Sequence, residues 1–327
     1  MSVFLVAEVA LAALVTAPPA PVDEHDTLTP PACFTHNITT YACPVGTCFC
    51  GPVWAEDELL NQTQTYSTKY DLALRLFAPP ATGPRRDNRT KRPAIVGIHG
   101  GHFEGGDFDE AGLVAWCIRW ARAGYVAASI NYRLTWKQYG HPGDIMHALW
   151  DARAAVRWLR ANAPRLGIDT ERIGIFGDSA GGMVAAYVTA VGGGEGDSGS
   201  PGYSSTVRAV VSLSGALWPP PPNASNVSAR EPAYLDFHGC EDPFVPYDCD
   251  GKPACTWSAV GTNRRMRAAG ARAGLVSFAG AGHVPWSDLD ANRSVETMLG
   301  FLVREMDLAH AQCPTVGRPE RGPRRRV

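Results

Sequence analysis

The sequence predicts an α/β fold in which helices cover both faces of a mostly parallel central sheet. Short apolar runs without polar alternation recur along the chain, which is typical of strands that are buried on both faces. Segments with helical periodicity separate these runs. Alternation of strands and helices favours a parallel sheet with helices on each side.

Each predicted element follows from its local pattern. Strands are expected over residues 70–77, 94–98, 125–130, 172–176, 207–213, 233–237 and 275–279. The clearest helix is expected over residues 144–163, where apolar side chains recur at three- and four-residue steps. Further helices are expected over residues 181–191, 257–273 and 288–309. Ligands of such sheets bind beyond the carboxyl ends of the strands, so the loops at those ends are the candidate functional segments.

Composition limits the classes of function. The chain has 327 residues, of which 45% are hydrophobic and 19% are charged, so it can bury a large core. The formal net charge of −2 gives no electrostatic case for binding nucleic acid. We expect one catalytic domain over residues 67–309. The basic residues 310–327 favour a solvated, disordered tail over a binding arm.

Residues 18–66 are rich in Pro, Thr and Cys and predict an irregular arm stapled by disulfides. Cys117 lies in a helical pattern and is expected to be a buried free thiol. Eight other cysteines could form four disulfides, and the sequence leaves their pairing open. These eight are Cys33, Cys43, Cys48, Cys50, Cys240, Cys249, Cys255 and Cys313. A metal site is the alternative, but Cys48 and Cys50 lack the two-residue spacer of a zinc knuckle and no histidine spacing completes a site.

The compartment is predicted from the amino-terminal segment and from glycosylation sequons. Residues 1–17 are mostly apolar, too short for a membrane span, and resemble a signal peptide, although an ordinary helix is the alternative. Six asparagines have Ser or Thr two residues later with no intervening Pro: Asn37, Asn61, Asn88, Asn223, Asn226 and Asn292. Together with the cysteines, they predict a glycoprotein of the secretory pathway that is secreted or lumenal.

A nucleophile is predicted at Ser179. The motif Gly177-Asp178-Ser179-Ala180-Gly181 follows a strand pattern and precedes a helix pattern. A sharp turn of this kind lifts a serine hydroxyl clear of the sheet, and the flanking glycines leave room where a Cβ would collide with the neighbouring strand and helix. The alternative is a glycine-rich connector.

Residues that could stabilise an oxyanion follow the strand at 94–98. His99-Gly100-Gly101-His102 lets the backbone turn its N–H groups inward. The predicted donors are the N–H groups of Gly100, Gly101 and Ala180. His99 is expected to orient the loop through backbone contacts rather than to act as a base.

The acid and the base should follow Ser179 in that order along the chain. His283 lies in a loop after the strand at 275–279 and is favoured as the base over His238 and His310. Asp242, in the loop after the strand at 233–237, is favoured as the acid over Glu241. The structural alternative is that Asp242 only caps a helix.

Taken together, these segments resemble one family. His99–Phe103, Asn131–Leu134, the helix over 144–163, the motif around Ser179, the segment 238–246 and Gly280–His283 occur in the order typical of serine esterases of the α/β-hydrolase superfamily, near the acetyl-esterase and feruloyl-esterase-like groups. The resemblance covers residues 67–305. It implies an α/β-hydrolase fold, a Ser179-His283-Asp242 triad and no cofactor or metal.

Two departures from the family pattern affect these expectations. His102 stands where a third glycine is common, and it could narrow the acyl pocket or give it a polar wall. The arm before residue 67 lies outside the family core and could form a cap or a surface-binding element.

The expected activity is hydrolysis of a small-molecule or carbohydrate-linked carboxylic ester through an acyl-enzyme. Only a short Pro-rich insertion, over residues 218–232, precedes the acid loop. The long helical lid of interfacial lipases has no counterpart in this sequence, which favours short acyl chains. The alternatives are an exopeptidase or amidase of the same fold and a secreted binding module without activity. The natural ester and the oligomeric state stay open.

Overall fold

In the computed structural model of the chain, the described residues are 41, 43, 47–135, 143–191, 194–217, 232–248, 258–290, 292–309, 311 and 313. Several predictions concern residues outside these ranges: the signal peptide, nearly all of the tail and of the 218–232 insertion, and the sequons at Asn37, Asn223 and Asn226. The side chain of Asn292 also lies outside the description. Within the described ranges, no helix is both long and apolar enough to cross a bilayer.

The described residues form an eight-stranded sheet with strand order β1-β2-β4-β3-β5-β6-β7-β8. Its strands are β1 (Leu60–Ser67), β2 (Leu72–Ala78), β3 (Arg92–Ile98), β4 (Val126–Ile130), β5 (Ile168–Asp178), β6 (Ala209–Leu213), β7 (Ala233–Gly239) and β8 (Ala273–Phe278). β2 pairs antiparallel with β1 and β4, and every other neighbouring pair is parallel. The mostly parallel sheet predicted from the sequence is therefore confirmed.

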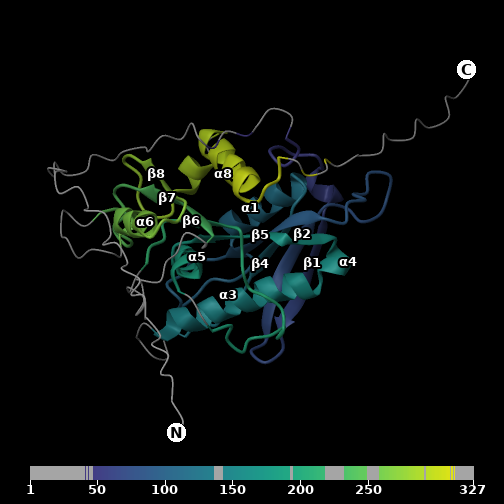
Figure 1. Cartoon of the computed structure of the whole chain (residues 1–327), viewed down its shortest axis with the longest axis horizontal. Coiled ribbons are helices and arrows are strands. Elements are labelled where there is room, and N and C mark those ends of the chain that lie inside the picture. Colours follow the sequence, from purple (N-terminus) through teal and green to yellow (C-terminus); the bar gives the residue numbers. More distant parts are fainter. Residues whose placement is uncertain are drawn as a thin grey trace, which may run out of the picture.

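Helices cover both faces of this sheet (Figure 1). They are α1 (Ala111–Arg122), α3 (Gly143–Ala161), α4 (Ala163–Leu166), α5 (Ala180–Ala190), α6 (Ala259–Ala268), α7 (Trp286–Leu289) and α8 (Asn292–Glu305). Successive strand residues point to opposite faces. In β3, Val96 packs in the core under α3 and α5, while Ile95 packs in the core under α1 and α8. Helix α1 buries Leu113, Cys117 and Trp120 at helical spacing, which fixes its inward face.

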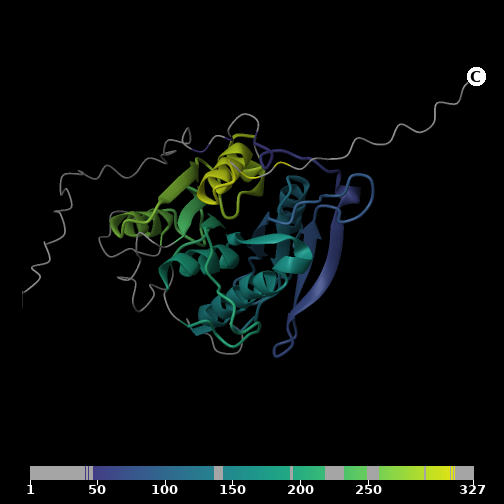
Figure 2. The same cartoon turned by 45° about the vertical axis from the view of Figure 1, so that its right-hand side comes forward.

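The first strand differs from the sequence prediction. β1 lies within the segment that the sequence assigned to the irregular arm, so the sheet begins at Leu60 and not at residue 67. Its sequence LNQTQTYS contains no apolar run, because an edge strand with its outward side chains in solvent needs little apolar surface. Figure 2 shows β1 and β2 as long blue ribbons at the right-hand edge of the molecule.

The described part of the arm packs on α1. Phe49 and Trp54 are buried, and the N–H groups of Val53 and Trp54 donate to the carbonyl oxygen of Arg122 at the end of α1. Arg122 precedes β4, so these contacts lie toward the amino ends of the parallel strands. A cap over the predicted site would lie at the opposite edge, so this part of the arm is not such a cap.

Disulfides anchor the same arm. Cys43 is bonded to Cys50, and Cys48 is bonded to Cys313 beyond the last helix, across a sequence separation of 265. Cys240 is also disulfide-bonded. Cys117 is a buried free cysteine, as the sequence predicts. The disulfides bring the start of the described chain and its end to the same side of the sheet.

Candidate active site

Ser179 lies at a sharp turn between β5 and α5. Its φ of 51° and ψ of −117° are rare for a residue with a side chain. A Cβ on Gly177 would lie 2.2 Å from the carbonyl oxygen of Gly181, and one on Gly181 would lie 2.1 Å from that of Ile98 in β3. Both contacts are impossibly short, which confirms the collision with helix and strand that the sequence predicts. The two glycines therefore permit the strained turn that presents the Ser179 hydroxyl.

Three side chains converge at this turn from separate loops. His283 Nε2 lies 2.8 Å from Ser179 Oγ, and His283 Nδ1 lies 2.7 Å from Asp242 Oδ2. With its Nδ1–H donated to the carboxylate, the ring presents Nε2 as an acceptor for the serine proton. Ser179 and Asp242 are buried, and the His283 side chain is 14% exposed. The structure thus brings together the three residues that the sequence predicts.

The Asp242 carboxyl is held as an anion. Its Oδ1 accepts hydrogen bonds of 2.9 Å from the N–H groups of Phe244 and Val245. Burial alone would raise the pKa of this carboxyl, but the hydrogen bonds from His238, His283 and those two N–H groups hold its pKa far below the ordinary value. Asp242 therefore stays ionised and able to hold the His283 ring. Glu241, the alternative acid, is exposed.

A second buried Asp–His pair lies behind the acid. His238 Nδ1 lies 3.0 Å from Asp236 Oδ2, and its Nε2 lies 2.8 Å from the carbonyl oxygen of Val245 and 3.4 Å from Asp242 Oδ2. Burial lowers the pKa of His238, but the charge of Asp236 and the hydrogen bonds from His238 to Asp236, Asp242 and Val245 raise it to about 10. His238 is thus a buried cation beneath the acid and not the base.

The loops that carry the acid and the base are tied to each other. The N–H of Glu241 donates to the carbonyl oxygen of Ala281 at 2.9 Å. A Cβ on Gly239 would lie 2.1 Å from the carbonyl oxygen of Gly282, so the close approach of the two loops requires glycine there. The N–H of Val284 donates to Ser214 Oγ at 3.0 Å, which links the base loop to the end of β6.

The side chains of Tyr132 and His99 orient the loop after β3 through contacts with its backbone. The Tyr132 hydroxyl donates to the carbonyl oxygens of His99 and Gly100 at 3.0 and 3.1 Å. His99 is buried, stacks on Tyr132 and has its Nδ1 2.7 Å from the carbonyl oxygen of Gly100. Burial lowers the pKa of His99, so its ring is neutral. His99 therefore orients the loop through the backbone, as the sequence predicts.

One predicted oxyanion donor has another partner. The buried Asp178 carboxyl accepts a hydrogen bond from the N–H of Gly100, and it also contacts the Glu110 carboxyl. Burial and the neighbouring Glu110 raise the pKa of Asp178 well above its ordinary value, and burial raises that of Glu110. The pair therefore binds a proton more readily than two solvent-exposed carboxyls would. This contact differs from the donor role that the sequence assigns to Gly100.

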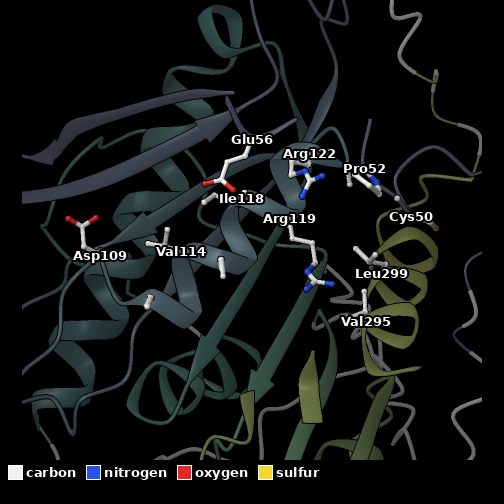
Figure 3. A pocket seen from close by; sticks show the side chains of 14 residues that line it. Cys50, Pro52, Glu56, Asp109, Val114, Ile118, Arg119, Arg122, Val295 and Leu299 are labelled. Atoms are coloured by element: carbon white, nitrogen blue, oxygen red, sulfur yellow. The ribbon is translucent and has the colours of Figure 1, made fainter. Parts of the chain in front are cut away.

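A separate hollow lies between the arm, α1 and α8 (Figure 3). It has a volume of about 700 Å³, and its walls include Pro52, Val114, Ile118, Arg119 and Leu299. None of the residues that line it belongs to the triad, and the loop after β3 contributes only Asp109, near the start of α1. Within the part of the chain that the structure describes, no group of three or more His, Cys, Asp or Glu side chains is arranged to hold a metal ion.

Comparison with known proteins agrees with this architecture. The BD-FAE family model matches residues 84–217. Carboxylesterase NlhH of Mycobacterium tuberculosis (strain ATCC 25618 / H37Rv) is 34% identical over 128 residues, which are 39% of this chain and 36% of that protein. Ethyl acetate hydrolase of Pseudomonas putida is 33% identical over 119 residues, which are 36% of this chain and 34% of that protein. The chain thus spans about a third of the length of these curated relatives.

A solved structure matches more of the chain. The native Est2 esterase of Thermogutta terrifontis superposes with a TM-score of 0.61 at 24% identity, covering 77% of this chain and 94% of that one. At this identity the likeness shows a shared fold. The sheet topology and the turn at Ser179 are those of the α/β-hydrolase fold. Over part of its length the chain is similar to carboxylesterases.

Proposed function

We propose that this protein is a serine hydrolase of carboxylic esters. The observation that carries the proposal is the hydrogen-bonded series in which His283 joins Ser179 Oγ at 2.8 Å and Asp242 at 2.7 Å. A serine hydroxyl needs such a base, and the base needs an anion to fix its tautomer. The similarity to carboxylesterases supports esters as the substrate class.

The reaction proceeds in two halves. Ser179 Oγ attacks the ester carbonyl carbon while His283 Nε2 takes the hydroxyl proton. The bond to the alcohol oxygen then breaks, and His283 gives that oxygen the proton. Water next attacks the acyl-serine, passes a proton to His283, and the proton returns to Ser179 as the acid leaves. Asp242 stabilises the imidazolium throughout, and the reaction uses no cofactor.

The negative charge that develops on the carbonyl oxygen requires backbone donors. Ala180 is the first residue of α5, so its N–H lies at the positive end of the helix. Gly101 has a φ of +100°, and the carbonyl oxygens of His99 and Gly100 before it are turned toward Tyr132. We assign the donors to Ala180 and Gly101, while Gly100 anchors the loop on Asp178.

Short acyl chains and a secretory location remain part of the proposal. The curated relative from Pseudomonas putida is an ethyl acetate hydrolase, which supports short esters. The disulfides Cys43–Cys50 and Cys48–Cys313 fit an oxidising compartment. Asn61 and Asn88 are exposed, as glycosylation acceptors must be. Expression in a secreting eukaryotic host should give glycosidase-sensitive protein in the medium, and unglycosylated protein retained in the cytosol would contradict this location.

The test of the activity uses the wild type and Ser179→Ala with p-nitrophenyl acetate. We expect kcat to fall by roughly 10⁴-fold or more in the variant, because the nucleophile is lost. A fluorophosphonate probe should label the wild type at Ser179 and leave the variant unlabelled. Circular dichroism of both proteins serves as the control for folding. Equal turnover by the two proteins would refute the assignment.

The same assay separates the alternatives. An exopeptidase or amidase would hydrolyse an aminoacyl p-nitroanilide faster than the matched ester. A binding module without activity would neither turn over the ester nor react with the probe. We expect the ester to be the better substrate and the probe to react.

A further inference from the structure

Phe244 is an exposed aromatic side chain beside the triad. The residue is 63% exposed, the most of any large hydrophobic residue among those the structure describes. The ring contacts the His283 ring edge-to-face, with centroids 5.2 Å apart and an interplanar angle of 63°. It also contacts the His102 ring, with centroids 5.7 Å apart and an angle of 80°. An apolar ring left in water next to a reactive centre is an available binding surface.

The position of Phe244 beside His283 indicates which part of a bound ester would contact the Phe244 ring. His283 Nε2 must deliver a proton to the alcohol oxygen when the ester bond breaks. That oxygen therefore lies within hydrogen-bond distance of Nε2, and the rest of the alcohol continues from it on the His283 side of Ser179. Because the Phe244 ring packs on the His283 ring, the alcohol part of the ester is the part that meets it.

The two rings come from two different loops of the site. The N–H of Phe244 donates to Asp242 Oδ1 at 2.9 Å, so the ring is carried by the loop that also supplies the acid. His102 has a φ of 57° and follows Gly101 in the loop after β3. The two rings therefore come from the two loops that flank the reacting ester.

We propose that Phe244 and His102 form a binding subsite for the alcohol part of the ester, and that this subsite favours alcohols with an aromatic ring. The inference rests on the proposed esterase function. A ring one or two bonds beyond the alcohol oxygen can pack against Phe244 while the acyl group occupies the other side of Ser179. Aromatic pairs of this kind change affinity by about 2- to 12-fold beyond the burial of their area.

The test uses two isomeric esters that place a phenyl ring on opposite sides of the scissile bond. Benzyl acetate carries the ring on the alcohol, and methyl phenylacetate carries it on the acyl group. In Phe244→Ala we expect the ratio of kcat/KM for benzyl acetate to that for methyl phenylacetate to fall about tenfold. Phe244→Tyr, which keeps the ring, should restore the ratio. Tyr203→Ala removes an exposed aromatic ring from the segment before β6 and should leave the ratio at its wild-type value.

The outcomes separate the inference from the function on which it rests. An unchanged ratio in Phe244→Ala, with both esters slowed equally, would show that the ring only supports His283. A ratio that rises would place the ring on the acyl side. Either result overturns the subsite while the esterase activity stands. If the wild type hydrolyses no ester and does not react with a fluorophosphonate, the proposed function and the subsite both fail.

Discussion

The buried Asp236–His238 pair leads to a sharp prediction about stability. An ordinary histidine has a pKa of 6.5, and the pKa of His238 in the folded protein is raised to about 10 by its hydrogen bonds and by the charge of Asp236, against the opposing effect of burial. A rise of this size makes the free energy of unfolding about 5 kcal/mol larger below pH 6.5 than above pH 10. The perturbation that removes it is the double variant Asp236→Asn/His238→Gln, in which neither side chain titrates.

The sign follows from the proton balance. Below pH 6.5 His238 is protonated in both the folded and the unfolded chain, so the stabilisation is fully present. Between pH 6.5 and about 10 only the folded state holds the proton, and the stabilisation is lost at about 1.4 kcal/mol per pH unit. From pH 7 to pH 9 the wild type should therefore lose about 3 kcal/mol more than the double variant.

Urea unfolding followed by tryptophan fluorescence, with the disulfides intact, measures this difference at several pH values between 6.5 and 9. The difference between the two proteins cancels the contributions of groups that titrate in both. Asp236→Asn alone is a second variant, because it removes the carboxylate that raises the pKa of His238, and it should flatten the profile as well. Parallel profiles within about 0.5 kcal/mol over this range would show that His238 is not a buried cation.

Three further predictions concern the triad, the turn at the nucleophile and the arm. Asp242→Asn should lower kcat about 10⁴-fold on p-nitrophenyl acetate, as in other triads where the base loses its anionic partner, and near-normal turnover would exclude Asp242 as the acid. Gly181→Ala should unfold or fail to react with a fluorophosphonate, since the added Cβ would lie 2.1 Å from a carbonyl oxygen of β3. The control is Gly105→Ala, where the added Cβ has open space, and this variant should melt at the wild-type temperature. Cys48→Ala/Cys313→Ala should cost about 2–5 kcal/mol in urea unfolding, and a reductant should abolish that difference.

The sequence alone identified most of the sheet and the three side chains at its edge. Parallel strands joined by helices place their carboxyl ends together, so Ser179, Asp242 and His283 each follow a predicted strand and meet. The prediction failed at β1, because a polar edge strand lacks the apolar run by which a buried strand is recognised. The arm was predicted from its cysteines, but which of them pair depends on where α8 ends relative to the arm.

Packing between distant segments decided the rest. The sequence shows Asp236 and His238 as polar residues in an apolar strand. Only the fold shows that they lie next to Asp242, because the loop after β7 folds back onto the end of that strand. Similarly, Asp178 takes the N–H of Gly100 because β3 and β5 are neighbours in the sheet. Local patterns determine where a reactive side chain can stand. The charge and hydrogen bonds that tune that side chain come from strands far apart in the chain, and only the assembled sheet brings them into contact.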